Sequence, residues 1–324
     1  MTALLLPPFT ARAYRGEIDL PAIVELINTC NVIDQLDHVV TIAELQNDLD
    51  NPDPDPVDEL RLWTNAEGQL IGYSRLRVLP ATTTAQEGFF NIKVHPEARY
   101  QGVEDQILAW AESTLRDLSR SLPVPLYLRT GARDIQTEQI TWLEQHGFSV
   151  VRCFYRMTRS LVDPIPAPQF PTGFTVRSLL PEEVPVWVEM FNQTFIDHWN
   201  HHPMTVERRQ RWLTHPTYDP ELDQVAIAPD GTFAAFCFSL IDQEDNRWTG
   251  RLDGWIGDLG TRRGFRRLGL GRAMLLTGMH QLKAKGMDTA LLGVDAENPS
   301  GALKLYESEG FRQQWSNFAY CKEL

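Results

Sequence analysis

Cysteine is scarce in this sequence, and long apolar runs are missing. The four cysteines among 324 residues lie far apart and form no Cys-x-x-Cys pair, so neither a zinc ribbon nor a dense disulfide framework is expected. No stretch of about 18 apolar residues is present to span a membrane, and the apolar run near the start is too short for a signal peptide. We therefore expect a cytoplasmic protein with reduced thiols and no membrane partner.

Basic side chains are also in short supply. Lys and Arg number 30 against 43 Asp and Glu, which gives a net charge of −13. The first 164 residues hold 14 basic and 23 acidic side chains, and the remainder holds 16 and 20, so neither half is predicted to bind nucleic acid. The length and the 43% hydrophobic content suffice for two domains, each with its own core.

Short motifs recur along the chain at offsets of 163 to 167 residues. The pairs are Phe9-Thr10-x-Arg12 with Phe174-Thr175-x-Arg177, Arg99-x-x-Gly102 with Arg266-x-x-Gly269, and Gly147-Phe148 with Gly310-Phe311. Between the copies lies a proline-rich segment, 163–171, which we interpret as a linker because proline disfavours both helix and sheet. We predict two tandem α/β domains, 1–162 and 172–324, each with a mixed, mostly antiparallel sheet flanked by helices. A second proline-rich run, 51–56, is predicted to be a loop.

The segment Arg266-Arg267-Leu268-Gly269-Leu270-Gly271 joins a predicted strand at 254–261 to a predicted helix that begins near residue 273. Its glycines let the backbone approach a ligand closely, and the first amides of a helix lack partners and carry partial positive charge. The pattern favours a phosphate-binding turn, although it also fits an ordinary solvated helix start. The arginines that crowd around it are Arg262, Arg263, Arg266, Arg267 and Arg272.

A second landmark follows a predicted strand at 289–294. It is the helix Asn298-x-x-Gly301-Ala302-x-x-x-Tyr306-x-x-x-Gly310-Phe311. Together the two motifs resemble the GNAT superfamily of acyl-CoA-dependent N-acetyltransferases, and the duplication resembles the group that contains mycothiol synthase and its relatives. The resemblance implies a GNAT fold in both copies and acetyl-CoA as the acyl donor. The cofactor-binding residues that it implies are Leu259, Gly260, Thr261, Arg266, Arg267, Leu268, Gly269, Gly271, Arg272, Asn298, Gly301 and Tyr306.

Catalytic roles follow from the same resemblance. A backbone N–H in 259–261 would stabilise the negative charge that develops on the thioester carbonyl oxygen. Tyr306 would protonate the departing thiolate, although it also fits a packed aromatic on an amphipathic helix. Many family members carry a glutamate base at the position of Trp255, so the base is left open between Asp253 and Asp258. Strict strand alternation places these two carboxylates on opposite faces, unless a bulge redirects one of them.

The first copy departs from the motifs where chemistry would occur. Glu104 replaces the second glycine of its turn, Asp105 follows it, and Leu143 stands at the position of Tyr306. Carboxylates there would repel a diphosphate, so tight CoA binding is disfavoured. We predict that the first copy is not catalytic.

The acceptor is predicted to be the amine of a small, cationic molecule, because the chain is acidic and Asp197 lies in a loop that would line the acceptor site. The three histidines that follow Asp197 match no regular ligand spacing, so no metal is predicted. Trp199, Trp212 and Trp255 are either an aromatic wall of that site or core residues. The competing function is a non-catalytic CoA-binding or scaffolding protein.

Overall fold

The computed structural model describes residues 9–50, 57–120 and 122–324, so the N-terminal run and the predicted loop at 51–56 lie outside the described residues. The chain divides into two compact units. Unit 1 comprises the residues up to Arg152 together with Asn317–Leu324, and unit 2 comprises Cys153–Ser316.

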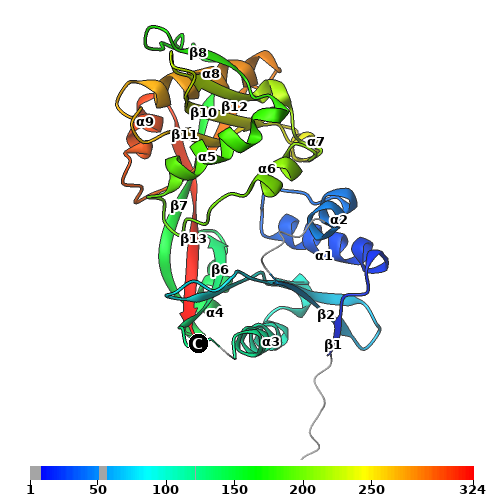
Figure 1. Cartoon of the computed structure of the whole chain (residues 1–324). Coiled ribbons are helices and arrows are strands. Elements are labelled where there is room, and N and C mark those ends of the chain that lie inside the picture. The colour runs from blue at the N-terminus through cyan, green and yellow to red at the C-terminus, as the bar shows by residue number, and fades with distance from the viewer. Residues whose placement is uncertain (1–8, 51–56, 121) are drawn as a thin grey trace, which may run out of the picture. The chain divides into compact units, whose positions relative to one another are not determined.

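Unit 1 is a mixed sheet with helices packed against it (Figure 1). Its strands lie in the order β1-β2-β3-β4-β6-β13, with β5 paired to β3, and among these pairs only β4 with β6 is parallel. Its elements are β1 (Phe9–Ala13), α1 (Leu20–Ile33), α2 (Ile42–Asp50), β2 (Val57–Asn65), β3 (Leu70–Val78), β4 (Gln86–Phe90), β5 (Lys93–Val94), α3 (Val103–Leu118), β6 (Leu126–Arg133), α4 (Thr137–Gln145) and the last part of β13 (Arg312–Glu323).

Unit 2 repeats this arrangement. Its strands lie in the order β8-β9-β10-β11-β12-β7, and among these pairs only β11 with β12 is parallel. Its elements are β7 (Ser149–Ser160), β8 (Thr175–Ser178), α5 (Val184–Phe195), α6 (Val206–Trp212), β9 (Asp223–Ile227), β10 (Phe233–Leu240), α7 (Gln243–Thr249), β11 (Asp253–Thr261), α8 (Leu270–Ala284), β12 (Thr289–Asp295) and α9 (Ala302–Ser308). The predicted pair of α/β folds with mostly antiparallel sheets is confirmed.

The final strand of each copy completes the sheet of the other unit. Residues Phe154–Ser160 of β7 pair with β12 in unit 2, whereas residues Asn317–Glu323 of β13 pair with β6 in unit 1. The compact units therefore depart from the predicted boundaries, 1–162 and 172–324, at these two strands. Repeat spacing locates copies along the chain, but it does not identify the sheet edge that each last strand joins. The predicted linker, 163–171, contains no helix or strand.

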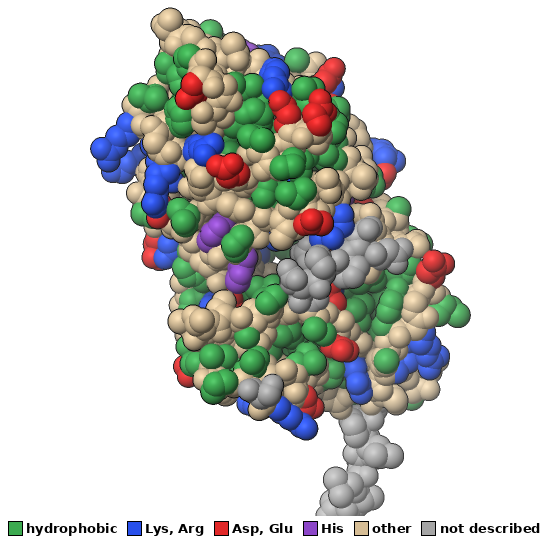
Figure 2. Space-filling view, viewed as in Figure 1, with side chains coloured by type: hydrophobic (Ala, Val, Ile, Leu, Met, Phe, Trp, Pro, Cys, Tyr) green, Lys and Arg blue, Asp and Glu red, His purple; other side chains and the backbone are tan. Residues whose placement is uncertain are grey.

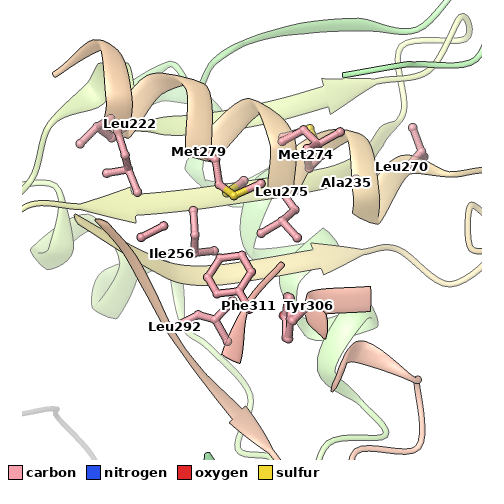
Figure 3. Close-up of a cluster of buried hydrophobic side chains, with 14 of the residues drawn as sticks. Leu222, Ala235, Ile256, Leu270, Met274, Leu275, Met279, Leu292, Tyr306 and Phe311 are labelled. Atoms are coloured by element: carbon pink, nitrogen blue, oxygen red, sulfur yellow. The ribbon is translucent and has the colours of Figure 1, made fainter. Parts of the chain in front are cut away.

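The core of unit 2 explains why β10 is apolar at nearly every position. Helix α8 covers one face of the sheet, where Met274, Leu275 and Met279 are fully buried, and α5 covers the other, where Trp187 packs against Phe236. A strand with both faces covered needs no alternation of polar residues. Each fully buried side chain of this size contributes about 2 kcal/mol. Figure 3 shows the α8 side of this core.

The surface carries charges of both signs. On the face shown in Figure 2, acidic and basic side chains are interspersed over both units. Among the described residues, no helix is long and apolar enough to cross a membrane.

Candidate active site

The candidate site begins where β11 leaves β12. The two strands pair only over Asp253–Ile256 and Thr289–Leu292, and β11 then continues to Thr261 along β10 alone. Arg262 N–H donates to Ala234 O at 2.8 Å. Because backbone groups alternate in direction along a strand, the N–H and C=O groups of Leu259 and Thr261 point away from β10, into the opening between β11 and β12. Unpaired groups of this kind suit an extended ligand that carries amides.

The glycine-rich turn lies at the end of this opening. Gly269 precedes α8 with φ +83°, and Arg267 adopts φ +66°, a conformation that is uncommon for a side chain with a Cβ. No described group accepts a hydrogen bond from the Arg267 N–H. A Cβ on Gly271 would lie 3.5 Å from Thr261 Oγ1, an ordinary contact, so packing does not require glycine there. The turn leaves backbone donors open at the N-terminus of a 15-residue helix.

Most of the arginines around the turn are held by acidic side chains. Arg263 and Arg266 contact the two carboxylate oxygens of Asp197 at 2.5 and 3.4 Å. Arg262 contacts Glu189 at 2.7 Å, and Arg272 contacts Glu309 at 2.5 Å. Asp197, predicted to lie in a loop that lines the acceptor site, is paired with basic side chains: Arg263, first, and then Arg266 hold the carboxylate and lower its pKa. Of the five arginines, Arg267 is the one with no acidic partner among the described residues.

Tyr306 lies on α9, where residues 298–301 set the start of the helix. Asn298 Oδ1 accepts from Ser300 N at 2.8 Å, and Gly301 caps the helix with φ +80°. The phenol ring is 8% exposed and packs edge-on against Phe311, as Figure 3 shows. Burial, and then the neighbouring Cys237 and Asp258, raise the pKa of Tyr306. Its hydroxyl makes no hydrogen bond to a described residue, so it is a neutral donor with no acceptor among those residues.

A bulge decides the direction of Asp258. Ser239 pairs with Ile256 but Phe238 pairs with Asp258, so Gly257 is an extra residue in β11. Cross-strand partners share a face, and the bulge therefore brings Asp258 to the α5 face with Phe238. Burial raises the pKa of Asp258, and Arg209 opposes that shift. No described group donates a hydrogen bond to this carboxylate.

Asp253 has a different setting. It begins β11, about 16 Å along the strand from Asp258. Its carboxylate accepts from Arg251 Nε at 2.8 Å, and its backbone N–H donates to Asn246 at 3.0 Å. These contacts give Asp253 a role in holding the strand. Trp255, at the position of the family glutamate, lies under the Arg156 guanidinium, whose carbon is 3.4 Å from the ring centroid.

A buried ion pair next to Asp258 could not be foreseen from any motif in the sequence. Arg209 of α6 bonds to Asp223 of β9, and Tyr218 OH donates to the same carboxylate at 3.1 Å. Both partners of the pair are almost fully buried, and the Arg209 guanidinium lies 3.9 Å from the Trp187 ring centroid. Only the register that places Asp223 opposite Phe238 brings these residues together.

Two of the three tryptophans that the sequence leaves open between an aromatic wall and core residues pack against other aromatic rings. Trp212 packs edge-on against Phe238 on the Asp258 face, with centroids 5.9 Å apart, whereas Trp199 packs against Phe154 at 6.0 Å. Burial lowers the pKa of His201, and the adjacent histidines lower it further. Within the described ranges, no three His, Cys, Asp or Glu side chains are grouped to hold a metal ion.

The fold and the candidate site resemble those of acyl-CoA-dependent transferases of the GNAT type. Residues 184–311 match the model of the acetyltransferase (GNAT) family. A mycothiol acetyltransferase from Thermobispora bispora is 32% identical over 169 residues, and this chain spans about half of that relative, 55%. One from Frankia casuarinae is 27% identical over 252 residues, which cover 75% of this chain and 69% of the relative.

A solved structure extends the match to both units. It is a GCN5-related N-acetyltransferase from Sphaerobacter thermophilus, 27% identical, which covers 98% of this chain and 96% of that one with a TM-score of 0.72. The family match, the relatives and this structure together support an N-acetyltransferase with tandem GNAT units, similar to the mycothiol acetyltransferases. Acetyltransferases of this family use acetyl-CoA as the donor and transfer its acetyl group to an amine.

Proposed function

We propose that unit 2 transfers the acetyl group of acetyl-CoA to the primary amine of a small, cationic acceptor, and that unit 1 is not catalytic. The observation that carries this proposal is the opening between β11 and β12, which ends at the glycine-rich turn and lies beside Tyr306. Tyr306 and the relatives favour an enzyme over a scaffolding protein.

The donor would lie along the opening. Its diphosphate would accept hydrogen bonds from the turn at 267–271, with Arg266, Arg267 and Arg272 near it. Its extended arm would pair with the inward backbone groups of Leu259 and Thr261, as a strand pairs with an open sheet edge. Leu268 is half exposed, so we assign it to the rim of the turn. Asn298 and Gly301 act by setting the start of the Tyr306 helix.

The chemistry then needs two proton transfers. The neutral amine nitrogen attacks the thioester carbon, and the carbonyl oxygen gains negative charge beside a β11 backbone N–H. Asp258 accepts the proton that the amine nitrogen loses, directly or through a water. The C–S bond breaks as the carbonyl re-forms, and Tyr306 protonates the departing thiolate. The raised pKa of Asp258 makes it a better base near neutral pH, and Tyr306 is protonated at that pH, as a general acid must be.

Asp258 also supports a cationic acceptor. Because Asp197 is held by arginines, the carboxylate available to an ammonium group is Asp258, and the whole chain is acidic at −13. An ammonium substrate would be attracted at long range, and salt would weaken that attraction.

The experiment is a screen of the full chain with acetyl-CoA against matched cationic, neutral and anionic amines, followed by free-thiol release at low and high salt. We expect the highest kcat/KM for a cationic amine, with a decrease as salt rises. Preference for the anionic amine, or no effect of salt, would refute the cationic acceptor. Binding of acetyl-CoA without acetylation of any amine would favour the scaffolding function.

A further inference from the structure

The glycine-rich turns of the two units follow the same backbone path. In unit 1, Tyr100 has φ +58° and Gly102 has φ +98°; in unit 2, the corresponding Arg267 and Gly269 have φ +66° and +83°. Helix α3 begins directly after Gly102, as α8 begins directly after Gly269. A left-handed conformation at a residue with a Cβ is uncommon, so its presence in both turns indicates that unit 1 keeps the shape of the turn.

The nearby arginine does not distinguish the two turns. Arg99 bonds to Asp34 through two contacts of 2.7 and 3.1 Å, and it donates to Val94 O at 3.1 Å. Unit 2 has the same arrangement, because Arg266 contacts both Asp197 and the Thr261 carbonyl oxygen.

Glu104 does distinguish them. Both of its carboxylate oxygens accept from the Tyr100 N–H, at 3.0 and 3.1 Å, and the residue is only 5% exposed. Burial raises the pKa of Glu104, and these backbone hydrogen bonds oppose the shift. In unit 2, Gly271 stands at the position of Glu104, and no described group accepts a hydrogen bond from the N–H of Arg267, which corresponds to Tyr100. The carboxylate of unit 1 therefore takes the place that a phosphate oxygen would need.

Beyond the turn, unit 1 still has a groove. Strands β4 and β6 pair only up to Phe89 and Arg129, so they separate as β11 and β12 do. A cavity of about 310 Å³ follows, and its lining includes Val94, Tyr100, Glu104 and Trp142. Asp105 does not close it, because its carboxylate contacts the Trp142 indole N–H at 3.1 Å and His146 at 3.2 Å.

We propose that unit 1 retains an acyl-CoA groove whose phosphate end is closed by its own Glu104 carboxylate. This contact is autoinhibitory, because the Glu104 carboxylate blocks the phosphate end of a turn whose backbone shape is retained. The inference rests on the proposed role of the unit 2 turn in binding the diphosphate.

The test exchanges one residue between the turns. Calorimetric titration with CoA, which cannot be turned over, would be done on the wild type, Glu104→Ala, Gly271→Glu and the double variant. We expect one CoA bound per chain in the wild type, two in Glu104→Ala, none in Gly271→Glu and one in the double variant. The double variant should bind CoA without acetyl transfer, because Leu143 stands where unit 2 has Tyr306. Circular dichroism would confirm that each variant is folded.

A Glu104→Gln variant separates occupancy from charge. Its amide oxygen can still accept from Tyr100, so the stoichiometry should stay at one. If Glu104→Gln bound a second CoA as fully as Glu104→Ala, occupation of the Tyr100 N–H would not explain the block. Charge repulsion by the carboxylate would then be the cause. If Glu104→Ala bound one CoA and Gly271→Glu bound none, this inference alone would be overturned. If Gly271→Glu still bound one CoA, the proposed cofactor site in unit 2 would be overturned.

Discussion

Replacing Asp258 with asparagine should lower activity and raise stability together. Loss of a general base costs about 10²- to 10⁴-fold in rate, so kcat/KM should fall within that range. The same carboxylate is recessed, has a raised pKa and receives no hydrogen bond from a described group. A neutral amide removes the cost of holding that charge, and we expect about 1 kcal/mol or more of added stability at pH 8.

The gain in stability should depend on pH. Because burial raises the pKa of Asp258, the folded state binds this proton more tightly than the unfolded state, and stability is lost as pH rises through the folded pKa. The advantage of asparagine should therefore be largest above that pKa and should shrink as pH falls toward about 4, the value for a free aspartate. Thermal unfolding at a series of pH values would measure it.

Asp253→Asn is the matched control, for which we expect lower stability and no loss of activity. Its carboxylate contacts Arg251 at 2.8 Å, so the change should cost up to about 1 kcal/mol of stability and leave kcat/KM nearly unchanged. If Asp253→Asn abolished turnover while Asp258→Asn stayed active, the assignment of the base would be reversed. An unchanged or lower stability of Asp258→Asn at pH 8 would refute the reasoning from burial.

Three further changes test other parts of the site. Tyr306→Phe should lower kcat by about 10²-fold with CoA affinity and melting temperature unchanged, since the hydroxyl makes no internal hydrogen bond; unaltered kcat would remove it from the mechanism. Gly260→Ala should cost about 1–3 kcal/mol because its Cβ would meet Thr194 Cγ2 at 2.5 Å, whereas Gly271→Ala should melt near the wild type, and equal melting temperatures would contradict this. Asp197→Asn should tighten acetyl-CoA binding severalfold at low salt, because it frees two arginines near the turn, and equal affinity would show that their ion pairs do not compete with the ligand.

The duplication, the fold class, the turn and the Tyr306 helix were all predictable from the sequence. Each depends on local signals: glycine spacing, apolar periodicity and motifs that recur at a constant offset. The helix that carries Tyr306 follows from such a motif, because it begins at a glycine-capped turn after a buried strand.

The direction of Asp258, the partners of the arginines and the sheet joined by each final strand were decided only by the tertiary structure. The Gly257 bulge exists only in the register with β10, and strict alternation therefore could not establish which face Asp258 occupies. Asp197 and Glu104 are carboxylates whose sequence contexts suggested an acceptor contact and a repulsive charge. Their actual roles depend on which cation or backbone N–H lies within hydrogen-bonding distance, and only the folded chain sets those distances.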